Sequence, residues 1–127
     1  MSTAPKRIRS IPPELVSASR IRVSTDPQDA ALSPLRFATD GGKIYVMIRG
    51  DSEHFKRIRN HWQVRLEPCS ILARVTGPES LGQAYILPEP EWPWARHLLG
   101  RKYCLLRIPF LWSQHNVFLE ITLTSHP

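Results

Sequence analysis

Alternation of apolar and polar side chains constrains the fold of this chain more than any other feature. In the segment NVFLEITLT, one face holds Val117, Leu119, Ile121 and Leu123, and the other holds Phe118, Glu120, Thr122 and Thr124. A period of two is typical of a strand with one buried face. The segments KIYVMI and GQAYIL alternate in the same way and are rich in β-branched or aromatic residues. The sequence therefore predicts a mainly β protein.

The segment LSPLRFATDGGKIYVMI predicts a β-hairpin. Two strand-like runs are separated by Asp40, Gly41 and Gly42, residue types that accept the positive φ of a tight turn. The segments SRIRVST and VRLEPC are predicted strands, and SILARV is a further candidate. CLLRIPF is interpreted as a strand that ends at Pro109, since proline cannot continue a sheet ladder.

Two short helices interrupt the strands. The first is predicted to begin at Asp51 or Ser52, both good N-cap residues, and to end near Trp62. At about 100° per residue, Phe55, Ile58 and Trp62 fall on one face, which we expect to pack against the sheet.

The second helix is EPEWPWARHLL, with Gly100 as its predicted C-cap. Many short strands with two helices predict a small antiparallel barrel decorated by helices. We expect residues 1–13 to form a flexible basic tail, or residues from Pro12 a short helix, and 14–127 to form a single domain.

Composition restricts the classes of function. The 127 residues carry a formal net charge of +6, which attracts anions such as nucleic acid, acidic lipid surfaces or phosphorylated cofactors. Basic residues cluster at 6–9, 20–22, 49–59 and 101–107, which argues against a disordered nucleic-acid-binding tail. No apolar run approaches the roughly 18 residues of a membrane span, and the N-terminus does not match a secretory signal.

Cysteines and histidines give no sign of a metal centre. Cys69 and Cys104 match neither a disulfide framework nor a metal spacing, so we expect reduced thiols in a cytoplasmic protein. Cys69 is interpreted as a small core residue rather than a nucleophile. The five histidines are scattered, and no carboxylate or cysteine completes a ligand set. If the protein is an enzyme, its reactive group is borrowed from a cofactor.

The segment from Asp51 to Cys69 places basic residues where a strand gives way to a helix. Free backbone N–H groups at a helix N-terminus bind anions, and the Ser52 hydroxyl adds a donor. Further donors stand nearby, namely Arg49, His54, Lys56 and Arg57. This pattern predicts a phosphate site; the alternative is a solvated basic face.

From Leu32 to about Leu87, the chain resembles the flavin- and deazaflavin-dependent split-barrel enzymes of the pyridoxamine 5'-phosphate oxidase-like class. The matching segments are SPLRFATDGGKIYV, DSEHFKRIRN, VRLEPC and TGPESLGQAYIL. GRKYCL looks like the Arg-Lys-Tyr-Gly element of that class, and FLEITLT like its closing strand. Together these segments cover most of the chain after residue 20.

The resemblance implies an FMN-binding split β-barrel that forms a homodimer, with the cofactor at the subunit interface. It implies an oxidoreductase that transfers hydride between the cofactor and a small organic substrate. The deazaflavin coenzyme F-420 is favoured, with FMN second. The implied cofactor-binding residues are Pro34, Leu35, Arg36 and Met47 around the ring, Ile48 and Arg49 near the phosphate end, Ser52, His54, Lys56 and Arg57 at the anionic tail, and Pro68 and Cys69 from the partner chain. No catalytic side chain is implied.

The chain departs from the pattern of that class at its phosphate motif. Where Thr-x-x-Asp-Ser-Gly-Lys is usual, Ile48 replaces the Thr, Glu53 the Gly and His54 the Lys. Arg36 replaces an aromatic residue and, like Arg49, is a candidate to supply the missing positive charge. Cys104 stands in place of a Gly.

These departures keep a second hypothesis open, in which a non-catalytic split barrel binds a cofactor, another anionic ligand or nucleic acid. Trp92 and Trp94 beside Arg96 could stack on bases, although we expect both to pack the second helix on the barrel. Nucleic acid is therefore not the expected partner. For a homodimer, FLEITLT and KIYVMI are the predicted contact surface.

Overall fold

The structure is a computed structural model that describes residues 11–25, 34–60, 62–72, 74–103 and 116–124. Its elements, in chain order, are α1 (Pro13–Val16), β1 (Arg20–Ser24), β2 (Phe37–Asp40), β3 (Lys43–Arg49), α2 (Glu53–Asn60), β4 (Gln63–Cys69), β5 (Ser80–Ile86), the 3₁₀ turn η2 (Glu89–Glu91), α3 (Trp92–Lys102) and β6 (Asn116–Leu123). The predicted strand CLLRIPF and most of the predicted N-terminal tail lie outside the described residues.

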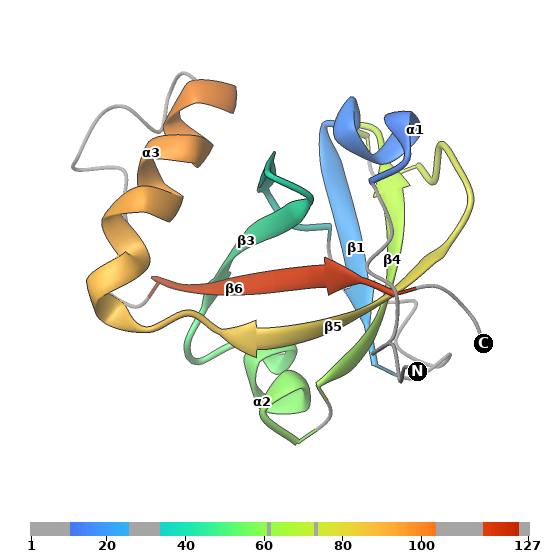
Figure 1. The fold of residues 1–127 in the computed structure, drawn as a ribbon. Coiled ribbons are helices and arrows are strands. Elements are labelled where there is room, and N and C mark those ends of the chain that lie inside the picture. The colour runs from blue at the N-terminus through green and yellow to red at the C-terminus, as the bar shows by residue number, and fades with distance from the viewer. Residues whose placement is uncertain (1–10, 26–33, 61, 73, 104–115, 125–127) are drawn as a thin grey trace, which may run out of the picture.

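The six strands form one antiparallel sheet in the order β1-β4-β5-β6-β3-β2. Figure 1 shows the sheet curling into a half-barrel, with α3 beside it. The curl brings the two edges together just before β2. There, Ile21 donates to the Leu35 carbonyl at 3.0 Å, and Leu35 donates back at 2.7 Å. The predicted mainly β barrel is confirmed.

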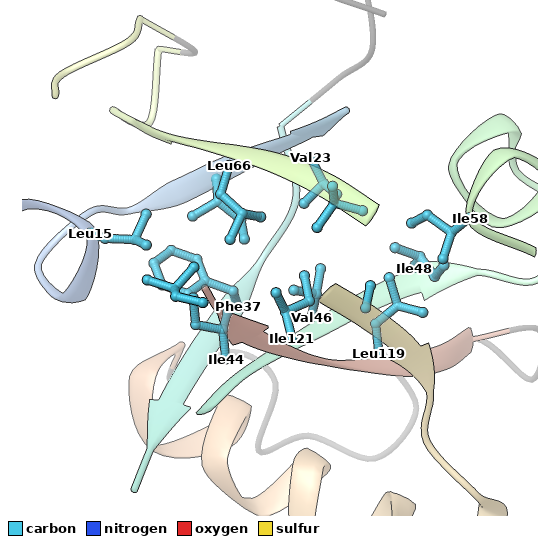
Figure 2. Packing of buried hydrophobic residues seen from close by; sticks show 14 of the residues in the cluster. Leu15, Val23, Phe37, Ile44, Val46, Ile48, Ile58, Leu66, Leu119 and Ile121 are labelled. Atoms are coloured by element: carbon cyan, nitrogen blue, oxygen red, sulfur yellow. The ribbon is translucent and has the colours of Figure 1, made fainter. Parts of the chain in front are cut away.

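The interior of the half-barrel is filled by the apolar faces of the strands. Figure 2 shows Val23 and Leu66 on one side of this core, with Phe37, Val46 and Ile121 on the other. Burying such a side chain contributes about 1.5–3 kcal/mol. α2 closes one end through Ile58, which is 5% exposed. The alternation predicted for this face is confirmed, because Leu119, Ile121 and Leu123 are fully buried.

The second face of β6 is also buried, unlike the exposed face of a half-buried strand. Phe118 lies in a second apolar cluster, where α3 packs Leu98 and Leu99 against the outside of the sheet. Trp92 joins it edge-on to Phe118, with 5.8 Å between ring centroids, and donates its indole N–H to the Leu87 carbonyl at 2.7 Å. The expectation that Trp92 packs the helix on the barrel is confirmed.

A buried carboxylate stands next to this cluster. Glu120 is 3% exposed and accepts hydrogen bonds from the Tyr85 hydroxyl at 2.8 Å and the Lys43 ammonium at 2.9 Å. The hydrogen bond and the charge of Glu120 raise the pKa of Lys43. The charge of the carboxylate is therefore compensated within the sheet.

The predicted dimer surface on FLEITLT and KIYVMI involves β3 and β6. Both are central strands whose side chains are largely buried within the chain itself. The prediction is therefore wrong for these buried faces.

Several local predictions are confirmed. The hairpin turn has positive φ at Gly41 (59°) and Gly42 (83°). Ser52 is the N-cap of α2, because its Oγ accepts from the Phe55 N–H at 3.3 Å.

Other boundaries differ from the prediction. α2 ends at Asn60, so Trp62 lies beyond it and is 53% exposed. α3 runs through Gly100 to Lys102, and Gly100 is a buried helical residue rather than a C-cap. SILARV is not a strand: among its described residues only Val75 forms a bridge, to Cys69. Within the described residues, no helix is long and apolar enough to cross a membrane.

Gly82 gives a test of the sheet geometry. A Cβ at this position would lie 2.9 Å from the Thr122 carbonyl oxygen, which is backbone of β6 and cannot move aside cheaply. We expect Gly82→Ala to lower the free energy of unfolding by about 1–3 kcal/mol in urea titrations. The neighbouring Gln83→Ala serves as control and should change it by less than about 0.5 kcal/mol. Equal stability of the two variants would contradict the packing of β5 on β6.

Candidate functional site

A pocket of about 420 Å³ opens where the two edges of the sheet meet. It is lined by Arg20, Pro34, Leu35, Arg36, Met47, Ile48, Arg49, Ser52 and Asn116. Its volume lies within the range of about 300–1,000 Å³ typical of small-molecule pockets. Apart from Arg20 and Asn116, every lining residue is one that the sequence associated with the cofactor.

Strand register explains which side chains share this pocket. The antiparallel pairing of Ile21 with Leu35 puts Arg20 opposite Arg36. The Met47 N–H donates to the Arg36 carbonyl at 3.1 Å, which extends the same row to β3. Opposed residues of an antiparallel pair project to the same face. Arg20, Arg36 and Met47 thus form one row across the outer face of the barrel split.

A second row of side chains lies two residues further along β3, on the same face of the sheet. Arg49 pairs with Asn116 of β6, and the Asn116 amide donates to the Met47 sulfur at 3.5 Å. Arg49 is held by Asp51 through two hydrogen bonds of 3.1 and 3.2 Å. Its positive charge is therefore compensated within the same turn.

Ser52 closes this end of the pocket at the start of α2. Its hydroxyl donates to the Arg49 carbonyl at 2.6 Å and accepts from the Phe55 N–H. The hydroxyl therefore orders the corner between strand and helix. A ligand anion at this end would meet a helix N-terminus and the guanidinium of Arg49.

Two of the predicted tail contacts on α2, Lys56 and Arg57, lie outside the pocket lining. Lys56 and Arg57 both stand near Glu53, with nitrogen–oxygen distances of 3.9 and 3.7 Å. The side chain of Lys56 is 66% exposed and that of Arg57 42%. His54 belongs to α2, and its side chain lies outside the described part of the structure. The role of these three residues in ligand binding stays a prediction.

Pro68 and Cys69 are both buried at the end of β4 and do not line the pocket of this chain. Cys69 pairs with Arg20, which places it in the next strand of the same row. Burial raises the pKa of its thiol, so the group stays protonated near neutral pH. This environment agrees with the interpretation of Cys69 as a core residue. A contact from a partner chain remains a prediction.

Arg20 and Asn116 are the lining residues that sequence reasoning missed. Arg20 alternates with buried Ile21 on an edge strand, so the pattern alone predicts an outward side chain but not its neighbour across the split. Asn116 meets Arg49 only through the pairing of β3 with β6.

The C-terminal end of α3 flanks the arginine row. The Lys102 ammonium lies 3.4 Å from the centroid of the Phe37 ring, and its Nζ is buried without a hydrogen-bond partner among the described residues. Burial first, and the charge of Arg20 second, lower the pKa of Lys102 to about 8. The Tyr103 hydroxyl donates to the Ser19 carbonyl at 2.7 Å and accepts from the Phe37 N–H at 3.2 Å.

Within the described residues, no group of three histidine, cysteine or acidic side chains is placed to hold a metal ion. Trp94, which we expected to pack the helix on the barrel, does so in part: it hydrogen-bonds with the Tyr45 side chain of β3, but it is 45% exposed and stacks on His97 with 5.6 Å between ring centroids.

Comparisons with known proteins bear on the fold. No family model and no curated protein matches the chain. It is similar to a solved structure of a candidate 5-nitroimidazole antibiotic resistance protein from Bacteroides thetaiotaomicron, with a TM-score of 0.63 and 10% identity over 88% of this chain and 76% of that one. A second solved structure has a TM-score of 0.60 and 16% identity, over 87% of this chain and 76% of its own. At these identities the likeness shows a split-barrel-like fold.

The buried charge of Lys102 predicts a pH-dependent cost in stability. A lowered pKa means that folding penalises the protonated form. The penalty is complete below pH 8 and is relieved as the pH rises from about 8 to 10.5. We expect Lys102→Met to raise the free energy of unfolding at pH 7 by about 1 kcal/mol, since the side chain as a whole is only partly buried and the lost ring contact reduces the gain.

Chemical denaturation of both proteins between pH 7 and 10.5 measures this difference, which should shrink towards the upper end. Arg101→Met, on an exposed neighbour in α3, is the matched control and should leave stability unchanged within about 0.5 kcal/mol. A Lys102→Met protein that is less stable than the wild type at pH 7 would contradict the unpaired burial of this ammonium.

Proposed function

We propose that the protein is an oxidoreductase that binds a flavin-type cofactor in the pocket at the barrel split. The cofactor would be the deazaflavin coenzyme F-420 in the first place, or FMN in the second. One observation supports this most directly: three separate segments that the sequence associated with the cofactor, 34–36, 47–49 and Ser52, line the same pocket. The fold likeness to a candidate nitroimidazole resistance protein is consistent with it.

The residues of the pocket fit the parts of such a cofactor. Pro34, Leu35 and Met47 offer apolar surface to a flat ring system, and Ser52 with Arg49 marks an end suited to an anionic tail. When bound, the cofactor supplies the hydride chemistry. The protein's own contribution is to position the ring, to exclude water from one of its faces, and to orient a small organic substrate beside it.

Local ion pairs at the α2 corner count against a cofactor phosphate there, which leaves a second candidate function: a split barrel that binds a different anionic ligand elsewhere in the pocket, without turnover. Asp51 compensates Arg49, and Glu53 stands near both Lys56 and Arg57. These pairs reduce the positive charge available to a phosphate at the α2 corner. Cofactor binding followed by a test of turnover separates the two functions.

Titration of the purified protein with the deazaflavin and with FMN, followed by absorbance and fluorescence, tests the proposal. We expect saturable binding of one of them and loss of at least about tenfold in affinity for Met47→Glu, because a carboxylate on the pocket floor repels both an apolar ring and an anion. Binding of neither cofactor by the wild type would reject the proposal.

Two further variants locate the anionic tail. Replacing both Lys56 and Arg57 with Ala should weaken cofactor binding by at least about 1–2 kcal/mol if the tail leaves the pocket along α2. Arg59→Ala, an exposed change on the same helix, is the matched control. Unchanged affinity in the double variant would confine the tail to the pocket.

We also propose that the protein is a homodimer, as the resemblance to flavin-binding split barrels implies. Because β3 and β6 are covered within the chain, the contact would have to use exposed apolar residues such as Tyr85, Ile86 and Trp94. Sedimentation at micromolar concentration should give twice the 14.6 kDa of one chain. A clean monomer would leave the cofactor with the residues of a single chain and would remove the proposed contacts from Pro68 and Cys69 of a second copy.

A further inference from the structure

Arg20 and Arg36 form a like-charged pair across the barrel split. They stand opposite each other next to the Ile21–Leu35 bridge and line the same pocket. Like charges directly opposed on neighbouring strands destabilise a sheet. Arg20 is held in place, because its guanidinium donates to the Ser19 carbonyl at 2.8 Å and lies 5.1 Å from the centroid of the Tyr103 ring.

A third positive charge, that of Lys102, adds to the destabilisation caused by the opposed charges of Arg20 and Arg36. The ammonium of Lys102 is buried close enough to Arg20 for the two charges to repel. The charge that acts on the pKa of Lys102 is that of Arg20, and the charges that act on the pKa of the neighbouring Tyr103 are those of Arg20 and Arg36; among the described groups, no carboxylate shifts either pKa. Arg49, at the other end of the pocket, differs because Asp51 compensates it.

We propose that Arg20 and Arg36 bind an anionic group, a carboxylate or a phosphate, at this end of the pocket, and that Lys102 strengthens the site as a buried charge behind them. The inference deepens the proposed function, since it predicts either an anionic substrate or a second anionic group on the cofactor. Anion binding itself does not depend on which cofactor is used.

The geometry suits such a ligand. Two guanidinium groups present planar forks of N–H donors, which match the paired oxygens of carboxylate and phosphate. An anion between them would also offset the repulsion between the two like charges. Lys102 would act through space rather than by contact, because its Nζ is closed off from solvent over the Phe37 ring.

The proposal makes anion affinity depend on pH. Bound anion favours the charged form of Lys102, so affinity should fall as the pH rises through about 8. Among the described residues, the other titratable groups whose pKa is shifted at this place are Tyr103 and Cys69, and burial raises the pKa of both. Lys102 is therefore the group expected to titrate between pH 7 and 8.5.

Sulfate is the probe of choice, because it keeps its charge over this pH range. NMR of the full chain can follow the guanidinium signals of Arg20 and Arg36 and the Cε signal of Lys102 during a sulfate titration, with chloride at equal ionic strength as reference. We expect saturable shifts of both arginines and a rise in the pKa of Lys102 from about 8 towards 10.5. Saturable shifts confined to the start of α2 would overturn the proposal.

Variants test each part of the site. Arg36→Ala should weaken sulfate binding at least about tenfold, as expected for loss of a charge-assisted hydrogen-bond partner. Lys102→Met should remove the pH dependence between pH 7 and 8.5 while sulfate still binds. Arg101→Met, one residue earlier on α3, should behave as the wild type. Equal sulfate affinity for Arg36→Ala and the wild type would refute the site.

The same titration separates this inference from the proposed function. Sulfate binding at the arginine pair, with no binding of FMN or deazaflavin, would leave the inference standing and reject the flavin proposal. Cofactor binding without sulfate binding would support the flavin proposal and reject the inference of an anion site. If cofactor-loaded protein still binds sulfate, the anion belongs to a substrate; if the cofactor competes with sulfate, the anion is the cofactor's own.

Discussion

Among the described residues, one pair of backbone hydrogen bonds, between Ile21 and Leu35, joins the two edges of the curled sheet. Edge strands expose unpaired N–H and C=O groups, and joining them satisfies some of these groups. The join also fixes register. Ile21 and Leu35 face the core, so their neighbours Arg20 and Arg36 must face outwards together. The pocket lies directly beside this point of closure.

The packing of β6 and α3 determines which side chains reach the split. β6 lies in the middle of the sheet and is buried on both faces, by the barrel interior on one side and by α3 on the other. Because α3 packs against the outside of β2, β3 and β6, its last turn ends beside the split. This packing, and not any feature of local sequence, brings Lys102 next to Arg20.

Local patterns in the sequence predicted the elements well. Alternation identified the core face of β6, the Asp40-Gly41-Gly42 turn identified the hairpin, and the N-cap preference identified Ser52. The resemblance singled out residues 34–36 and 47–49, which line one pocket. Arg20 and Asn116 could not be found in this way, since each joins the pocket through a strand pairing that has no local signal. The buried second face of β6 was missed because it depends on a distant helix.

The distribution of charge separates the two ends of the pocket. At the α2 end, the carboxylates of Asp51 and Glu53 stand within salt-bridge distance of nearby cations, so that end is close to neutral without a ligand. At the split, Arg20, Arg36 and Lys102 gather with no such compensation among the described residues. Proteins are marginally stable, so the folding free energy lost to uncompensated positive charges must be offset by the rest of the fold. The repulsion among these three cations is unfavourable without an anion and is relieved when one binds. The relief adds to the binding free energy of an anion, which is how a site selects for negative charge.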